Sequence, residues 1–134
     1  MSATLDTNVV LRLVLKDIPE QYEIIKDLIT AQGAQFRLSD MVAVDLVHAL
    51  MHHYDLNRSQ VAEILRSLLI DPNIDSNRAL LESVIKSFVT HPSLSFVDCY
   101  LSEEAKATGN LPLVTFDKKL ASQHDAAQLM SNHP

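Results

Sequence analysis

The sequence contains little cysteine and no long apolar run. Cys99 is the single cysteine among 134 residues, which excludes a disulfide within the chain and gives no support to a cysteine-rich zinc site. We expect Cys99 to be a small apolar core side chain. No uncharged apolar stretch reaches about 18 residues, and no basic segment leads into an apolar one. We therefore expect a soluble, unsecreted, cytoplasmic protein that does not interact with membranes.

Basic residues are also few. Eleven lysines and arginines face 17 aspartates and glutamates, and the formal net charge is -6. This balance argues against a protein that holds nucleic acid mainly by displacing counterions. It does not exclude an enzyme that meets a phosphodiester through bound divalent cations, because clustered carboxylates lower the net charge and a metal ion inverts it locally.

The chain has no internal repeat, low-complexity tract or linker, so we expect one domain over residues 1–134. A domain of this size buries about two thirds of its unfolded surface. Apolar periodicity and turn residues predict short strands that alternate with helices, which indicates an α/β fold. Strands are expected at 2–6, 35–38 and 111–116. Helices are expected at 9–15, from 19 to before Gly33, and at 41–54, 57–69, 76–89, 95–109 and 118–123, with a loosely ordered tail after about 123.

Cap residues mark several helix ends. Asp17 with Glu20, and Asn57 with Gln60, each have the three-residue spacing of a capping box. Gly109 is expected to end the helix over 95–109, because glycine tolerates the left-handed conformation found there.

Four aspartates come from four separate elements. Asp6 ends the first predicted strand, Asp117 follows the last one, Asp98 lies in the first turn of a helix, and Asp45 lies in the middle of an apolar helix. The carboxyl ends of strands in open α/β sheets line a crevice where such acids could converge. Without a metal ion their charges would repel, whereas Mg²⁺ prefers oxygen ligands of this kind.

Each aspartate also has a structural interpretation. Asp6 could form a turn, and Asp117 could cap the last helix. The negative charge of Asp98 could be stabilised by the positive end of its helix dipole. Asp45 could be a solvated or hydrogen-bonded residue. That interpretation is harder to accept, because aspartate is a poor helix former and the neighbours of Asp45 are apolar.

Two histidines suggest a different metal site. His48 and His52 are four residues apart on one helix, and Asp45 lies on nearly the same stripe, which could form a face for a transition metal. Exposed helix histidines, or a pH-sensitive patch near a dimer surface, explain the pair more simply.

Four segments together resemble the PIN-domain ribonucleases, and within them the VapC-like toxins of type II toxin-antitoxin pairs. These segments are Leu5–Asn8, Val42–Arg58 with an acid at 45, Phe96–Leu101 and Leu113–Lys118. The resemblance runs from residue 3 to about 121. Each motif is weak alone, and the four in this order and spacing make a strong signal.

The resemblance implies a three-layer α/β/α sandwich around a central parallel sheet. It also implies Mg²⁺- or Mn²⁺-dependent endonucleolytic cleavage of RNA, by metal-activated water attack on a phosphodiester. A homodimer and a cognate antitoxin are the implied partners. Asp6, Asp98 and Asp117 fall on the metal-site aspartates of the family, and Thr7 and Thr115 fall beside them as supporting residues.

Asp45 departs from the family pattern, which usually has glutamate there. The shorter side chain keeps the charge and has less reach, so we include Asp45 among the metal and catalytic residues. A water bridge, a shifted helix and a weaker second metal are the open alternatives. Asp40 is no obvious substitute, because it lies about 140° away around the helix and is better placed, like Ser39, as a cap. A catalytically weak or inactive scaffold protein with a PIN fold is the alternative function.

Scattered basic residues could steer RNA phosphates toward the predicted site. Arg12 and Lys16 follow the first strand, Arg37 precedes Ser39, and Lys118 and Lys119 follow Asp117. The simpler alternative is that these side chains are solvated at the surface.

Overall fold

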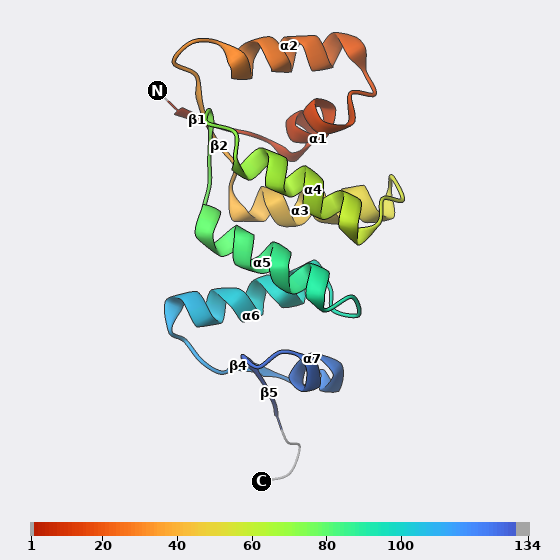
Figure 1. The fold of residues 1–134 in the computed structure, drawn as a ribbon, viewed down its shortest axis with the longest axis vertical. Helices are drawn as coiled ribbons and strands as arrows, with labels where there is room; N and C mark the ends of the chain where they lie inside the picture. The colour runs from red at the N-terminus through yellow and green to blue at the C-terminus, as the bar shows by residue number, and fades with distance from the viewer. Residues whose placement is uncertain (1, 131–134) are drawn as a thin grey trace. The chain divides into compact units, whose positions relative to one another are not determined.

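The computed structural model describes residues 2–130, and the chain forms two compact units, residues 1–78 and 79–134 (Figure 1). Each unit is described by itself below. The interpretation of residues 1–134 as one domain stays a prediction.

The first unit consists of a parallel sheet and the helices that connect its strands. Its elements are β1 (Ser2–Thr4), α1 (Thr7–Leu15), α2 (Pro19–Thr30), β2 (Gln35–Arg37), α3 (Asp40–His52), α4 (Arg58–Leu69) and β3 (Ile74–Asp75). The strand order is β1-β2-β3, and both pairs are parallel. Pairing continues past β1, because the Leu5 N–H donates to the Arg37 carbonyl at 2.9 Å. The residues that follow β1 and β2 therefore leave the sheet at the same edge.

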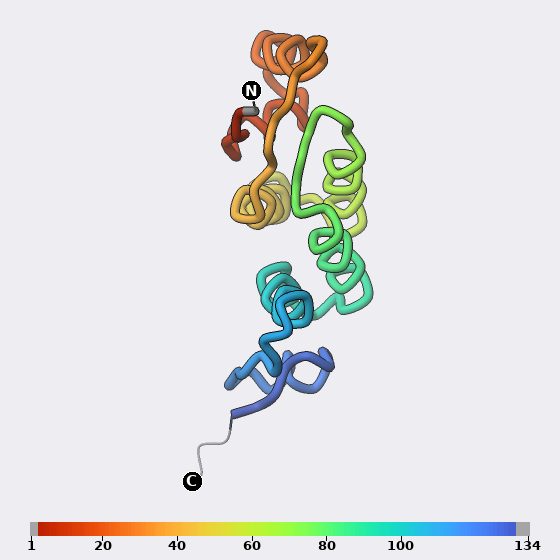
Figure 2. The backbone as a smooth tube through the Cα atoms, turned by 90° about the vertical axis from the view of Figure 1, so that its left-hand side faces the viewer, coloured from red at the N-terminus to blue at the C-terminus, as the bar shows by residue number. Residues whose placement is uncertain are grey.

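Helix caps explain where α3 and α4 begin, and their apolar faces explain why they pack against each other (Figure 2). The Ser39 hydroxyl accepts from the Val42 N–H and caps α3, and the predicted capping box of Asn57 and Gln60 is present on α4. Buried residues on these two helices contribute to the core: Ala43, Leu46, Val47, Leu50, Val61, Ala62, Leu65, Leu68 and Leu69.

The second unit contains a helical hairpin and a second parallel strand pair. Its elements are α5 (Arg78–Thr90), which begins at the unit boundary, α6 (Phe96–Thr108), β4 (Leu113–Thr115), α7 (Lys118–Gln123) and β5 (Ala127–Leu129). Ser95 caps α6 at its start, and Gly109 ends it with a φ of 72°, as predicted. The rings of Phe88 and Phe96 pack edge to face with centroids 5.3 Å apart.

All described strand pairs are parallel and helices separate the strands in sequence, which confirms the α/β fold class. No helix within residues 2–130 combines the length and the apolar character needed to cross a membrane.

Some predicted boundaries were wrong. The cap before α2 is Ile18 without a side-chain bond, because Asp17 instead pairs with Arg12 at 3.3 Å. The same helix ends at Thr30, and Gly33 lies in the following turn with a φ of 78°. The first strand ends at Thr4 rather than at residue 6.

Two short strands were missed. β3 has two residues and pairs with β2, and β5 pairs with β4 in the segment that was expected to be a loose tail. Residues 131–134 of that expected tail lie outside the described residues.

Candidate metal centre

Asp6 starts α1 without capping it. It occupies the N-cap position with extended backbone angles, yet its side chain accepts no cap hydrogen bond. Its side chain is exposed and has no hydrogen-bond or ion-pair partner among residues 2–130. An aspartate at an N-cap normally uses a carboxylate oxygen to bind a backbone N–H of the first turn. The carboxylate of Asp6 therefore keeps both oxygens for another ligand.

Asp45 lies in the second turn of α3, which starts from the same edge of the sheet as α1. The expectation that Asp45 lies among apolar neighbours was wrong, because its side chain is exposed. The buried face of α3 consists of Ala43, Leu46, Val47 and Leu50, and Asp45 projects from the opposite side of the helix. Its carboxylate likewise has no partner among the described residues.

Asp40, beside the Ser39 cap, is held by a different network at this edge. The Asn77 Nδ2 donates to both carboxylate oxygens of Asp40 at 3.0 Å, while Arg37 pairs with Asp75 at 3.2 Å and its guanidinium reaches the Asn77 Oδ1 at 3.5 Å. Because its oxygens already accept these bonds, Asp40 is a poorer candidate ligand than Asp45.

In the second unit, Asp98 lies in the first turn of α6. The local fold is fixed by its backbone, since the Asp98 N–H donates to the Ser95 Oγ at 3.1 Å and the Asp98 carbonyl accepts from the Ser102 Oγ at 2.8 Å. The side chain is half-buried and makes no hydrogen bond or ion pair with residues 2–130. Two bonds to the main chain thus hold the residue while its carboxylate stays available.

Asp117 caps α7, as its structural interpretation predicted. Its Oδ1 accepts from the N–H groups of Lys119 at 2.9 Å and Leu120 at 3.2 Å. The Thr115 Oγ1 accepts from the Asp117 N–H at 3.0 Å, so Thr115 supports the position of Asp117. The cap uses one carboxylate oxygen, and Oδ2 has no partner in the described part of the chain.

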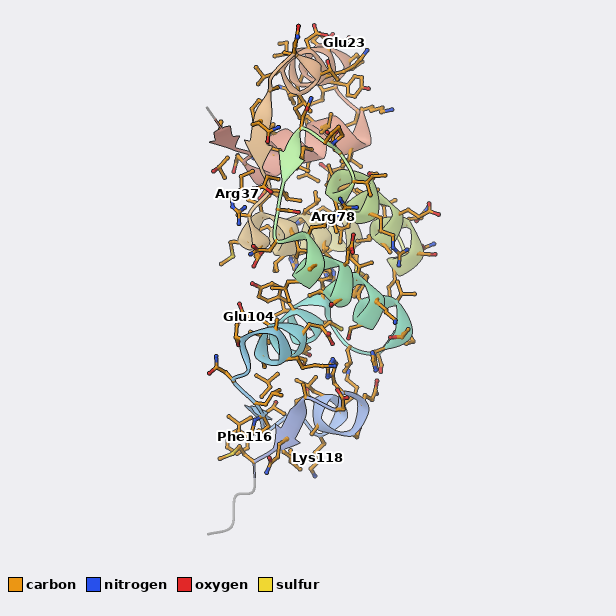
Figure 3. All side chains as sticks on the ribbon, turned by 60° about the vertical axis from the view of Figure 1, so that its left-hand side comes forward. Glu23, Arg37, Arg78, Glu104, Phe116 and Lys118 are labelled. Atoms are coloured by element: carbon orange, nitrogen blue, oxygen red, sulfur yellow. The ribbon has the colours of Figure 1, made fainter. Side chains whose placement is uncertain are left out.

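Asp98 lies at the start of α6 and Asp117 follows β4, and these two elements contact each other. β4 follows α6 after a short turn and contacts it, so the strand runs back toward the start of the helix. Ten residues of helix from Asp98 cover about 15 Å, and the six steps from Leu111 to Asp117 cover about 20 Å. Figure 3 shows Phe116 and Lys118 where β4 ends and α7 begins, with Glu104 on α6.

The donor chemistry of these residues fits a hard divalent cation. All four side chains offer carboxylate oxygens, and three of the carboxylates have no partner among residues 2–130. Asp6 and Asp45 belong to the first unit, and Asp98 and Asp117 belong to the second. Within residues 2–130, no three side chains of histidine, cysteine, aspartate or glutamate are grouped closely enough to hold a metal ion by themselves.

The other predicted residues have mixed roles. Thr7 is half-buried as the first residue of α1. Arg12 is engaged inside its unit, since its guanidinium donates to the Tyr54 hydroxyl at 2.9 Å and pairs with Asp17. Lys118 and Lys119 are exposed next to Asp117.

The alternative transition-metal site at His48 and His52 has no third ligand among residues 2–130. The rings of His48 and His52 lie 4.6 Å apart, and His53 lies 6.2 Å from His48. All three are exposed, and residues 2–130 contain no metal-holding group of three side chains. The simpler interpretation as exposed helix histidines is the better one.

One polar pair had no signal in the sequence. The imidazole of His124 is buried and lies 2.5 Å from the carboxylate of Glu103, which is 21 residues away. Sequence spacing could not have joined them, because the contact depends on how α7 and β5 fold back onto α6.

Comparison with known proteins identifies the family of the chain. A search of the curated proteins finds no match. The PIN domain family pattern matches residues 3–125, which is most of the chain. PIN domains are generally nucleases that act on RNA or other nucleic acid, and they typically use divalent metals. The chain belongs to the PIN domain family.

Proposed function

We propose that this protein is a Mg²⁺- or Mn²⁺-dependent endoribonuclease and the toxin of a toxin-antitoxin pair of the VapC type. The observation that carries the proposal is Asp6, which occupies a helix cap position without using its carboxylate for the cap. A residue selected only for helix stability would accept the available hydrogen bond. An unused carboxylate at the carboxyl end of a strand fits a metal ligand.

The four aspartates Asp6, Asp45, Asp98 and Asp117 would hold the metal. When bound, the cation supplies an activated water and offsets the negative charge that develops on the attacked phosphodiester. Asp117 would ligate through Oδ2 while Oδ1 keeps α7 in place. Attack by water predicts products with 5′-phosphate and 3′-hydroxyl ends.

The surrounding residues would position these acids and the RNA. Thr115 and Ser95 hold the backbones of Asp117 and Asp98 through their hydroxyls. Lys118 is exposed at the start of α7, where its ammonium group would meet a substrate phosphate. Arg12 has no such role, because Tyr54 and Asp17 already bind its guanidinium.

One surface of the first unit is suited to binding a protein partner. A groove of about 270 Å³ lies along α1 and α2, with Val9, Ile24 and Ile25 in its lining. Ile24 is 68% exposed, and Leu28 further along α2 is 54% exposed. We propose that an antitoxin segment with an apolar helical face covers this groove, and that the toxin is a homodimer.

Incubation of the purified protein with an RNA pool tests the nuclease. We expect cleavage with Mg²⁺ or Mn²⁺, loss of cleavage with a chelator, and loss of cleavage in Asp98→Asn. Products ending in 2′,3′-cyclic phosphate would contradict the proposed attack by water. A folded protein that binds RNA and does not cleave it under any of these metals would favour the scaffold alternative, in which Asp45 in place of glutamate has disabled the site.

The toxin assignment has its own test. We expect the protein to co-purify with a small protein encoded beside it and to regain RNA cleavage when that partner is removed. Substituting Ile24→Lys should release the partner and leave RNA cleavage intact, because Ile24 lines the groove and is not one of the proposed metal ligands. Unchanged co-purification of the variant would exclude the groove as the docking surface.

A further inference from the structure

A buried imidazole joins α6 to the end of α7. The His124 Nε2 lies 2.5 Å from the Glu103 Oε2, and the two side chains are 3% and 13% exposed. The His124 Nδ1 accepts from the backbone N–H of Ala126 at 3.1 Å. Because Nδ1 is the acceptor in that bond, the proton of the neutral ring lies on Nε2 and is donated to Glu103.

The helix α7 connects this pair to Asp117. Asp117 is the N-cap of α7, and His124 is the C-cap, with its backbone N–H bonded to the Leu120 carbonyl at 3.0 Å. The six helical residues between them span about 9 Å. A helix this short moves as one rigid segment, so a displacement at His124 also moves Asp117.

The helix α6 connects the same pair to Asp98. Glu103 follows Asp98 by five residues, which is about 7.5 Å along the helix axis. Because five residues turn a helix by about 140°, Glu103 and Asp98 project from different sides of α6, and His124 contacts the side that carries Glu103. The bond between Glu103 and His124 therefore fixes how the two ligand-bearing helices lie against each other.

Two other side-chain contacts at this end of α7 lie on the surface. The Ser93 hydroxyl donates to the Gln123 Oε1 at 2.8 Å on the surface, and Lys106 pairs with Asp125 at 3.7 Å with both side chains exposed. Exposed ion pairs contribute little. A polar cavity of about 440 Å³ also lies here, with Glu103 and His124 in its lining, and the backbone just after His124 is held by the Leu113 N–H, which donates to the Ala126 carbonyl at 2.8 Å.

We propose that Glu103 and His124 are positioning residues for the metal centre, which set the separation of the Asp98 and Asp117 carboxylates. This inference rests on the proposed function, because it assumes that these two aspartates ligate the metal. Groups that hydrogen-bond directly to a metal ligand change metal affinity by about 10- to 100-fold when they are removed, and Glu103 and His124, which act through α6 and α7, should have an effect at the lower end of this range.

Mn²⁺ binding to the full chain, followed by the electron paramagnetic resonance of free Mn²⁺, tests the proposal without reference to cleavage. We expect Glu103→Ala and His124→Ala to bind Mn²⁺ about tenfold more weakly than the unsubstituted protein. Glu103→Gln keeps an oxygen that accepts from Nε2, and we expect its affinity to stay within about threefold. The matched control is Ser93→Ala, which removes the exposed hydrogen bond from Ser93 to Gln123 at the same end of α7 and should leave affinity unchanged.

The metal-free melting temperature separates positioning from simple stability. A result in which Glu103→Ala and His124→Ala melt lower and bind Mn²⁺ with unchanged affinity would overturn the proposal. If His124→Ala does not fold, the comparison of Glu103→Ala with Glu103→Gln decides, and equal affinities in these two would overturn it. Failure of the unsubstituted protein to bind Mn²⁺ would overturn the proposed function as well. If Asp98→Asn loses Mn²⁺ binding while Glu103→Ala and His124→Ala keep it, the positioning role is overturned and the proposed function stands.

Discussion

Substitutions of Asp117 separate its role as a helix cap from its proposed role as a metal ligand. Its Oδ1 accepts two backbone hydrogen bonds at the start of α7, and Oδ2 has no partner among residues 2–130. Asparagine caps helices about as well as aspartate and lacks the negative charge, whereas alanine lacks both functions. Asp117→Asn should therefore keep the cap and lose the ligand, and Asp117→Ala should lose both.

The expected size of each effect follows from these bonds. Loss of an N-cap costs about 1 kcal/mol, within a range of about 0.5–2 kcal/mol. For a chain of this length, 1 kcal/mol lowers the melting temperature by about 3–6 °C. Asp117→Asn should melt close to the unsubstituted protein in the absence of metal, and both variants should lose Mn²⁺ affinity because a neutral side chain is a poor ligand for a hard cation.

Two measurements on the same samples test the argument. Differential scanning calorimetry without metal reports the cap, and titration with Mn²⁺ reports the ligand. Unchanged Mn²⁺ affinity in Asp117→Asn would show that the carboxylate does not ligate. A melting temperature equally low in the asparagine and alanine variants would show that the two hydrogen bonds do not account for the stability contributed by Asp117.

Four further predictions concern single positions. Asp6→Asn should abolish metal-dependent RNA cleavage while the free energy of unfolding stays within about 0.5 kcal/mol, because Asp6 makes no cap hydrogen bond; a large loss of stability would contradict this. Asp45→Glu restores the longer side chain and should lower the Mn²⁺ concentration that gives half-maximal cleavage, and an increase would argue against ligation from this position. Ser95→Ala removes the cap of α6 and should cost about 1 kcal/mol in urea denaturation. Phe88→Ala should cost about 3–5 kcal/mol in the same assay, because the side chain is 1% exposed, and a loss below about 1 kcal/mol would show that the core closes around the cavity.

Helix boundaries were predictable where the signal was local. Asn57 and Gln60 are three residues apart and bond each other's backbone, so the sequence contains the whole capping box. Gly109 ends α6 for an equally local reason, since its φ of 72° is costly for other residues. Asp17 shows the limit of such signals. Its spacing to Glu20 suits a cap, and the guanidinium of Arg12 competes successfully for its carboxylate.

Short strands were not predictable from their own residues. β3 consists of Ile74 and Asp75, and it is a strand because Phe36 and Arg37 of β2 pair with it. Two residues show no alternating pattern, so only the partner strand identifies them. The buried contact of Glu103 and His124 has the same character, because it depends on the folded path of the chain between them.

Three of the four predicted site residues lie at or near the start of a helix. Asp6 is the N-cap of α1, Asp98 lies in the first turn of α6, and Asp117 is the N-cap of α7. The positive end of each helix dipole favours a carboxylate there, so these charges are tolerated before any metal binds. Asp45 lies further into α3 and has neither this support nor a hydrogen-bond partner among residues 2–130. Of the four carboxylates, Asp45 is thus the one whose presence is least explained by fold stability. Its side chain is also shorter than the glutamate usual in the family. The activity of Asp45→Glu is therefore the most informative single test of whether a four-carboxylate site exists.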